Sequence, residues 1–266
     1  ENYIDINKIK TVYGVSIGFI NAFCIALKYD FQEIMNYQIN RPWENIFNIK
    51  PSTAIYNVVM KKGIFDVQLW EKCLSPLLLA KNFTTDVTLQ ELFDSTNIEL
   101  HGIATDINEF KTLDFSYKTH PDLKIIDAVH MSCALPFLFT PPFIDNTLYL
   151  DGGTTNNFPL DLCIKNSNIE NTDTILAFKN LHKASFITKL NDKSDFSEII
   201  STIIRKLTSK LHDTNENTVK YTINLYTQGI DASTMTSLLD KNNRQILLDK
   251  GEEYTRLFLE YHSILN

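Results

Sequence analysis

The stretch Ile9-Lys10-Thr11-Val12-Tyr13-Gly14-Val15-Ser16-Ile17-Gly18 joins a β-like run to an apolar helical run that continues to Leu27. It contains the pattern Gly-x-Ser-x-Gly with Ser16 at its centre. When this pattern follows a strand and opens a helix, the sharp turn lifts the serine hydroxyl out of the sheet. Because side chains at positions 14 and 18 would collide inside so tight a turn, we expect both glycines to be needed. Ser16 is thus a candidate nucleophile, although a serine that merely caps the helix fits the same pattern.

A second glycine pair follows Asp151, which ends the apolar run Leu148 to Leu150. We expect the Asp151 carboxylate at the carboxyl end of a strand, beside Ser16 in a parallel sheet, where the catalytic groups of α/β folds gather. The alternative is an Asp-Gly hairpin turn. The residues from Thr154 to Pro159 are polar and irregular, which disfavours a matched second strand.

Strand-like and helical segments alternate along the chain, which predicts an α/β fold with a mostly parallel sheet covered on both faces. The predicted strands are Ile9 to Val15, Ile98 to Ala104, Leu148 to Leu150, Thr174 to Phe178 and Val219 to Leu225. Residues 29 to 95 read as a helix-rich insertion. Helices are expected from Asp195 to Leu211 and, after Gly251, from Glu252 to about Leu265.

Composition excludes several function classes. The chain has 266 residues, a net charge of −7 and 44% hydrophobic residues. The acidic balance argues against nucleic-acid binding, which depends on basic surface. The four cysteines lie far apart without a Cys-x-x-Cys pair, so we expect neither a zinc site nor a disulfide framework, and no metal or other cofactor. Without a signal peptide or an 18-residue apolar run, we expect a soluble, intracellular protein of otherwise unassigned compartment.

A serine nucleophile needs a base, and the sequence offers two kinds. In the α/β-hydrolase order the acid and then a histidine follow the serine, which leaves His182, His212 and His262 for a Ser-His-Asp esterase. Each of these lies in a polar loop or at a helix end and reads more simply as a surface histidine. Asp151 is the other candidate base.

Taken together, these motifs resemble the patatin-like phospholipase family. Its signature joins the Gly-x-Ser-x-Gly turn to an Asp-Gly-Gly or Asp-Gly-Ala motif through a segment of the form Ala-Ser-x-Ala-x-Pro. The matching segments here are Gly14 to Ala22, Gly102 to Asp106, Asp127-Ala128-Val129-His130-Met131-Ser132-Cys133-Ala134-Leu135-Pro136, Tyr149-Leu150-Asp151-Gly152-Gly153, and Ile223 to the C-terminal helix. The resemblance covers nearly the whole chain and is least specific at residues 29 to 95.

The resemblance implies a three-layer α/β/α sandwich and a calcium-independent lipid acyl hydrolase. By motif position, Ser16 is the nucleophile and Asp151 its general base, in a dyad that forms an acyl-enzyme. Phospholipids or other lipid esters are the implied substrates, with transient contact to a membrane surface and no nucleic acid; whether a protein activator takes part is left open. Five apolar residues between the motifs either line an acyl-chain pocket or belong to the core: Phe137, Leu138, Phe139, Phe143 and Ile144.

One departure from the family concerns the oxyanion hole. The family carries a glycine-rich loop before the serine turn whose N–H groups bind the oxyanion, whereas this sequence has no glycine before Gly14. We therefore expect residues 1 to 266 to form a single patatin-like catalytic domain whose glycine-rich segment lies upstream of Glu1. The alternative is a non-catalytic lipid-binding or partner-binding scaffold of the same fold.

Overall fold

The computed structural model describes residues 5–166, 169–181, 190–192, 199, 202, 203, 206, 218–226 and 239–265. The chain divides into two compact units. The first comprises Glu1–Ile34 and Asn45–Pro159, and the second comprises Met35–Glu44 and Leu160–Asn266. Both motif residues, Ser16 and Asp151, belong to the first unit. Most of the helix expected from Asp195, together with His182 and His212, lies outside the described residues.

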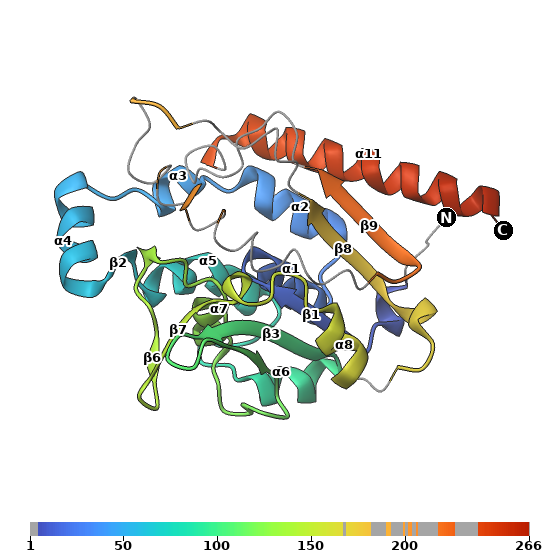
Figure 1. Ribbon diagram of the computed structural model, residues 1–266, viewed down its shortest axis with the longest axis horizontal. Helices are drawn as coiled ribbons and strands as arrows, with labels where there is room; N and C mark the ends of the chain where they lie inside the picture. Colours follow the sequence, from blue (N-terminus) through green and yellow to red (C-terminus); the bar gives the residue numbers. More distant parts are fainter. Residues whose placement is uncertain are drawn as a thin grey trace. The chain divides into compact units, whose positions relative to one another are not determined.

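The main sheet of the first unit is organised around one strand, β3 (Figure 1). Its members are β1 (Thr11–Val15), β3 (Glu99–Asp106), β4 (Lys111–Phe115), β6 (Phe143–Ile144) and β7 (Thr147–Asp151). β1 pairs with β3 in parallel, whereas β4 and β7 run antiparallel to β3, and β6 runs antiparallel to β7. The α/β class is as predicted, but this sheet is mixed rather than mostly parallel, because β4 returns from β3 through a short turn and β7 returns from β6.

The register along β3 explains how two distant motifs meet. One edge of β3 is occupied by β4, which pairs with residues 102–106. On the other edge β1 ends with Val15 opposite Ile103, and β7 ends with Asp151 opposite Ala104. The carboxyl ends of β1 and β7 therefore converge from opposite directions on neighbouring residues of β3. The sequence argument expected the same proximity from a parallel sheet, and an antiparallel strand achieves it instead.

Helices of the first unit pack against this sheet through apolar side chains. α1 (Ile17–Ala26), α6 (Leu89–Thr96) and α7 (Ile125–Ser132) all contact β3, and α5 (Val67–Ala80) packs on α7. Phe19 of α1 meets Phe115 of β4 edge to face, with ring centroids 5.4 Å apart. Burial of such side chains stabilises the fold by about 1.5–3 kcal/mol each. The largest fully buried ones are Phe19, Phe23, Phe115, Leu74, Leu78, Leu89, Leu92, Ile98, Ile103, Ile125, Met131 and Val129.

The range from 29 to 95 contains five helices and one short strand. These are α2 (Phe31–Asn40), α3 (Trp43–Ile46), α4 (Pro51–Lys61), β2 (Gly63–Phe65), α5 and α6. β2 pairs in parallel with β5 (Phe137–Phe139) in a separate two-stranded sheet. That the range is one insertion within a single catalytic domain stays a prediction, since part of α2 and α3 groups with the second unit.

The second unit pairs β8 (Leu176–Leu181) in parallel with β9 (Tyr221–Tyr226). The long helix α11 (Lys241–Leu265) packs against β9, and the Tyr254 hydroxyl donates a hydrogen bond to the Tyr226 carbonyl. The sequence placed the start of this helix after Gly251, which was wrong: the helix runs through Gly251, at a cost of about 1 kcal/mol for a helical glycine. Short helices in the chain are Ile6–Lys8, Gly152–Thr154, α8 (Leu160–Asn166) and Thr172–Thr174. Among the described residues, no helix is long and apolar enough to cross a bilayer.

Candidate active site

The two motif residues meet through their side chains. The Ser16 hydroxyl donates a hydrogen bond of 2.5 Å to Oδ2 of Asp151. The other carboxylate oxygen, Oδ1, accepts a hydrogen bond of 2.8 Å from the Gly153 N–H. The structure thus brings together the two residues that the sequence singled out, in the geometry that transfer of the serine proton to the carboxylate requires.

The backbone at Ser16 distinguishes a nucleophile turn from a plain helix cap. Ser16 precedes α1 with φ 53° and ψ −129°, and its side chain makes no capping hydrogen bond to the helix. A non-glycine residue held at such dihedrals costs about 1–3 kcal/mol. The interpretation of Ser16 as a capping serine is therefore wrong, because the strained turn directs its hydroxyl to Asp151 instead.

Ser132 holds the strained turn in place. Its hydroxyl accepts a hydrogen bond of 3.0 Å from the Ser16 N–H and donates one of 2.8 Å to the Ile103 carbonyl. A single buried hydroxyl therefore connects the turn to β3 and to the end of α7. The sequence argument quoted Ser132 as part of a motif but gave it no role, because its partners lie far away along the chain.

The carboxyl group of Asp151 is buried, with only 3% of the residue exposed. Burial raises its pKa from an ordinary value of 3.8 to about 6, and the hydrogen bonds from Ser16 and Gly153 offset only part of that rise. The backbone of Asp151 is also fixed, since its N–H donates to the Ala134 carbonyl and its carbonyl accepts from Thr105. The site therefore contains a positioned carboxyl group with a pKa near neutrality, as a general base needs.

A buried thiol, Cys133, lies next to this pair. Burial, and secondarily the Asp151 carboxylate, raises the pKa of the Cys133 thiol well above its ordinary value, and the thiol contacts Ser16. A thiol with a raised pKa remains protonated and unreactive. Across the described residues no disulfide links the cysteines, and no cluster of three or more His, Cys, Asp or Glu side chains could hold a metal ion.

The glycines of the two motifs differ in what they permit. A Cβ at Gly14 would lie 2.5 Å from both the Gly18 carbonyl oxygen and the Phe19 Cα, and at Gly152 it would lie 2.3 Å from the Ile103 carbonyl oxygen. At Gly18 a Cβ meets nothing within 4 Å. The expectation that position 18 must be glycine to avoid a collision was wrong, because the chain is already helical there and its side chain would point into open space.

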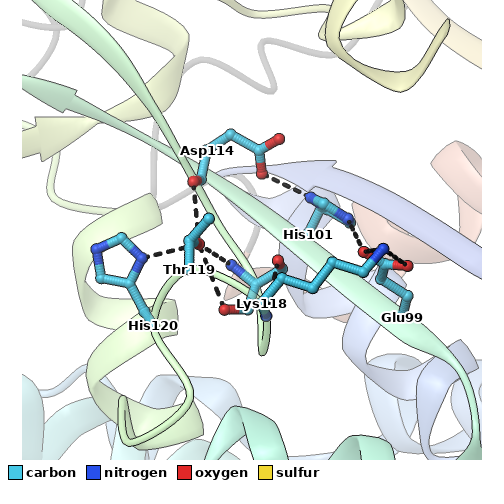
Figure 2. Close-up of polar contacts among 7 residues, drawn as sticks. Glu99, His101, Asp114, Lys118, Thr119 and His120 are labelled. Carbon is cyan, nitrogen blue, oxygen red and sulfur yellow. Dashed lines mark hydrogen bonds and ion pairs between the residues drawn. The ribbon is translucent and has the colours of Figure 1, made fainter. Parts of the chain in front are cut away.

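The described histidines have partners or surroundings of their own. His101 of β3 contacts Asp114 at 2.7 Å through Nδ1 and Glu99 at 2.8 Å through Nε2, and Figure 2 shows it between these two carboxylates. His130 of α7 is buried against Phe139. His262, the only described member of the three proposed triad histidines, lies against the Phe258 ring of its own helix. The carboxylate that accepts a hydrogen bond from the Ser16 hydroxyl is Asp151.

The predicted acyl-pocket residues do not form one lining. Phe139 is buried against Trp70, whereas Phe137 is exposed. Phe143 and Ile144 do line a cleft of about 350 Å³. Neither Ser16 nor Asp151 lines this cleft, whose residues are Asp66, Val67, Asp127, His130, Thr140, Pro141, Pro142, Phe143 and Ile144.

Comparison with known proteins places this sequence in a family. The sequence model of the patatin-like phospholipases matches residues 3–164. The "Probable lipid hydrolase 463L" of Invertebrate iridescent virus 6 is 30% identical over 77% of this chain and 76% of its own length. Protein R571 of Acanthamoeba polyphaga mimivirus is 31% identical over 61% of this chain and 53% of its own length.

More distant similarity extends to a bacterial protein and to a solved structure. YqhO of Bacillus subtilis (strain 168) is 24% identical over 95% of this chain and 89% of its own length. VipD from Legionella pneumophila aligns with 94% of this chain and 62% of its own, with a TM-score of 0.45 and 15% identity. Because the family model covers well over half of the sequence, including both motifs, the chain belongs to the patatin-like phospholipase family.

Proposed function

We propose that this chain is a lipid acyl-ester hydrolase of the phospholipase A type, in which Ser16 is the nucleophile and Asp151 the general base. The observation that carries the proposal is the 2.5 Å hydrogen bond from the Ser16 hydroxyl to the buried Asp151 carboxylate. A serine hydroxyl is a weak nucleophile until an adjacent base accepts its proton. Asp151 is placed to do so without a histidine.

In the first half of the reaction, Ser16 Oγ attacks the ester carbonyl carbon while its proton passes to Asp151. Negative charge then develops on the carbonyl oxygen of the tetrahedral intermediate. α1 begins at Ile17, directly after the nucleophile. The N–H groups that open a helix carry the positive end of its dipole, so they favour an anion at this position. When the intermediate collapses, the C–O bond to the alcohol breaks and Asp151 returns the proton to the leaving oxygen.

In the second half, a water molecule attacks the acyl-enzyme. Asp151 accepts a proton from this water, the new tetrahedral intermediate expels Ser16 Oγ, and the proton returns to that oxygen. The fatty acid leaves and the dyad is regenerated. The rise of the Asp151 pKa to about 6 suits a group that both takes up and returns a proton near neutral pH.

The lipid nature of the substrate is supported by the family and by the printed name of the iridescent virus relative. The exposed side chain of Ile17, beside the nucleophile, is consistent with an apolar substrate. Carried over from the family resemblance, the proposal also includes independence from calcium. Activity is therefore expected to persist unchanged when a calcium chelator is added to the assay.

Covalent labelling with a fluorophosphonate probe tests the nucleophile directly. The full-length gene product is expected to be labelled, and Ser16→Ala should abolish labelling and hydrolysis of a phosphatidylcholine substrate. Ser95→Ala, at an exposed serine of α6, is the matched control and should behave like the unmodified protein. Labelling that persists in Ser16→Ala would rule out the assignment.

A second comparison separates the dyad from a triad. Asp151→Asn should abolish hydrolysis, whereas His262→Ala should leave it unchanged. The opposite result would support a Ser-His-Asp esterase. A correctly folded protein that neither reacts with the probe nor hydrolyses lipid would instead indicate a non-catalytic scaffold.

A further inference from the structure

The helix α4 carries an unusually apolar exposed face. Ile55, Tyr56, Val59 and Met60 are each between 60 and 72% exposed. They recur at i, i+1, i+4 and i+5, which places them together on one side of the helix. Monomeric proteins rarely leave so many large apolar side chains adjoining one another in water, and such patches mark surfaces that bind something.

The opposite side of α4 faces the rest of the first unit and carries smaller or more polar side chains. Asn57 donates a hydrogen bond of 2.9 Å to the Ile64 carbonyl, and Ala54 and Val58 are half-buried. A surface helix ordinarily turns its apolar face inward and its polar face to water. In α4 four large apolar side chains, those of Ile55, Tyr56, Val59 and Met60, are exposed, so the core of the protein does not account for them.

Positive charge flanks this apolar face. Lys50 immediately precedes the helix and Lys62 caps its end, whereas Lys61 pairs with Asp66 at 3.5 Å. Between positions 45 and 65 the chain has no acidic residue, although the whole protein has a net charge of −7. Lysines at the end of a helix also suit its dipole, but Lys50 at its beginning opposes the dipole. The position of Lys50 therefore points to an external anion.

We propose that α4 docks on an anionic lipid surface, with its apolar face entering the interface and its lysines meeting lipid phosphates. An apolar helical face bordered by lysines is the form that interfacial helices take. Each lysine near an anionic bilayer contributes about 1 kcal/mol. Tyr56 fits the same interpretation, because tyrosine combines an apolar ring with a polar tip. The inference rests on the proposed function to the extent that a lipid hydrolase must reach its substrate.

A continuous path of structure connects α4 to the Ser16–Asp151 pair. α4 packs on β2, and β2 pairs with β5, where Gly63 lies opposite Phe137. The segment that precedes β5 contains Ser132, which holds the Ser16 turn, and Ala134, whose carbonyl accepts from the Asp151 N–H. Docking through α4 should therefore hold the catalytic end of the first unit at the lipid, while leaving its chemistry unchanged.

Vesicle binding tests the proposal. The full-length protein is expected to co-sediment with vesicles of phosphatidylcholine and phosphatidylglycerol in equal parts. The double variant Ile55→Gln/Val59→Gln should lower the partition coefficient at least about tenfold, since each buried apolar side chain contributes about 1.5–3 kcal/mol. The matched control is Leu257→Gln/Tyr261→Gln, at exposed apolar residues also spaced i, i+4, on α11. The control should bind as the unmodified protein does.

A charge variant tests the lysines separately. Lys50→Gln/Lys62→Gln should weaken binding to the anionic vesicles by roughly tenfold or more. It should leave binding to pure phosphatidylcholine vesicles unchanged. Equal binding of all variants to anionic vesicles would overturn the proposal, and so would a failure of the unmodified protein to bind. The proposal would also be overturned if the unmodified protein were a dimer and Ile55→Gln/Val59→Gln a monomer that binds vesicles equally well. That result would assign the apolar face to contact with a second copy of the chain.

The outcome remains distinguishable from a failure of the proposed function. Fluorophosphonate labelling and hydrolysis of a short-chain water-soluble ester, both measured without vesicles, should be the same in all α4 variants. Labelling without vesicle binding would overturn the docking surface and retain the dyad. Binding that depends on α4 in a protein without labelling would retain the docking surface and overturn the dyad.

Discussion

Two carboxylates, one on strand β3 and one on the strand paired with it, have opposite electrostatic environments. Asp151 lies opposite Ala104 near the carboxyl end of β3, and burial raises its pKa to about 6. Glu99 begins β3; burial also raises its pKa, but hydrogen bonds and charge from Lys118 and His101 lower it overall (Figure 2). The contacts with Lys118 and His101 therefore hold Glu99 as an anion. Asp151 is buried with a hydroxyl and an N–H as its partners, so its pKa lies near neutrality.

His101 lies between two carboxylates. Its Nδ1 and Nε2 each lie within hydrogen-bonding distance of a carboxylate oxygen, of Asp114 and Glu99 respectively. With Lys118, which contacts Glu99 at 2.7 Å, these residues form a cluster of two carboxylates, one imidazole and one ammonium group. None of the hydrogen bonds described above for the Ser16–Asp151 pair involves this cluster.

The largest effect is expected from Asp151→Asn, which removes the one carboxylate of the pair. Hydrolysis of a soluble ester should fall at least about 10⁴-fold, the loss that other serine hydrolases show when one member of their catalytic set is disabled. The same change should raise the free energy of unfolding at neutral pH, by at most about 3 kcal/mol for a shift from 3.8 to about 6. Urea unfolding and initial rates measure the two effects.

The sign of the stability effect follows from the raised pKa. Asp151 favours the folded state fully below its unfolded pKa of 3.8, and that contribution is lost as the pH rises through about 6. The gain from Asp151→Asn should therefore grow over this range and then level off. Asp145→Asn, at an exposed carboxylate in the turn before β7, is the control and should change neither quantity. A destabilised Asp151→Asn protein would contradict the contrast between the two carboxylates.

The next effect is the dependence of the rate on pH. In the proposed mechanism Asp151 must be ionised to accept the Ser16 proton, so kcat/KM for a soluble ester should rise through a pKa of about 6. The value at about pH 5 should be roughly tenfold below that at about pH 8. A profile that is flat across this interval would show that another group is the base.

A smaller and purely structural effect is expected from His101→Asn. The change removes the ring that contacts both Glu99 and Asp114. Loss of one member of a buried polar pair costs about 3 kcal/mol. His120→Asn, where the lost hydrogen bond is to the neighbouring Thr119, should cost about 1 kcal/mol. Chemical unfolding gives both values. Fluorophosphonate labelling of folded His101→Asn should equal that of the unmodified protein, and a loss of labelling would mean that this cluster serves the dyad after all.

The sequence predicted the parts of this arrangement that depend on local pattern. The five apolar runs named as strands are all strands, and Ser16 and Asp151 were identified from their glycine neighbours. It missed β4, whose mixed polar residues acquire a strand conformation only by pairing with β3. It also missed the convergence of β1 and β7 on Ile103 and Ala104, because register along a shared edge is not encoded in either strand alone. The role of Ser132 went unseen for the same reason.

The smallest effect is expected from Lys118→Gln, which distinguishes the contribution of Lys118 from that of His101 in the cluster around Glu99. The Lys118 ammonium approaches Glu99 at 2.7 Å, but its side chain is 55% exposed. An ion pair so open to water is screened, so Lys118→Gln should lower the free energy of unfolding by less than about 1 kcal/mol, and by still less at high salt. Unfolding at low and high salt measures this. If Lys118→Gln cost as much as His101→Asn, the cluster would owe its stability to its total charge. A small cost would place that stability in the buried His101 ring and its two hydrogen bonds.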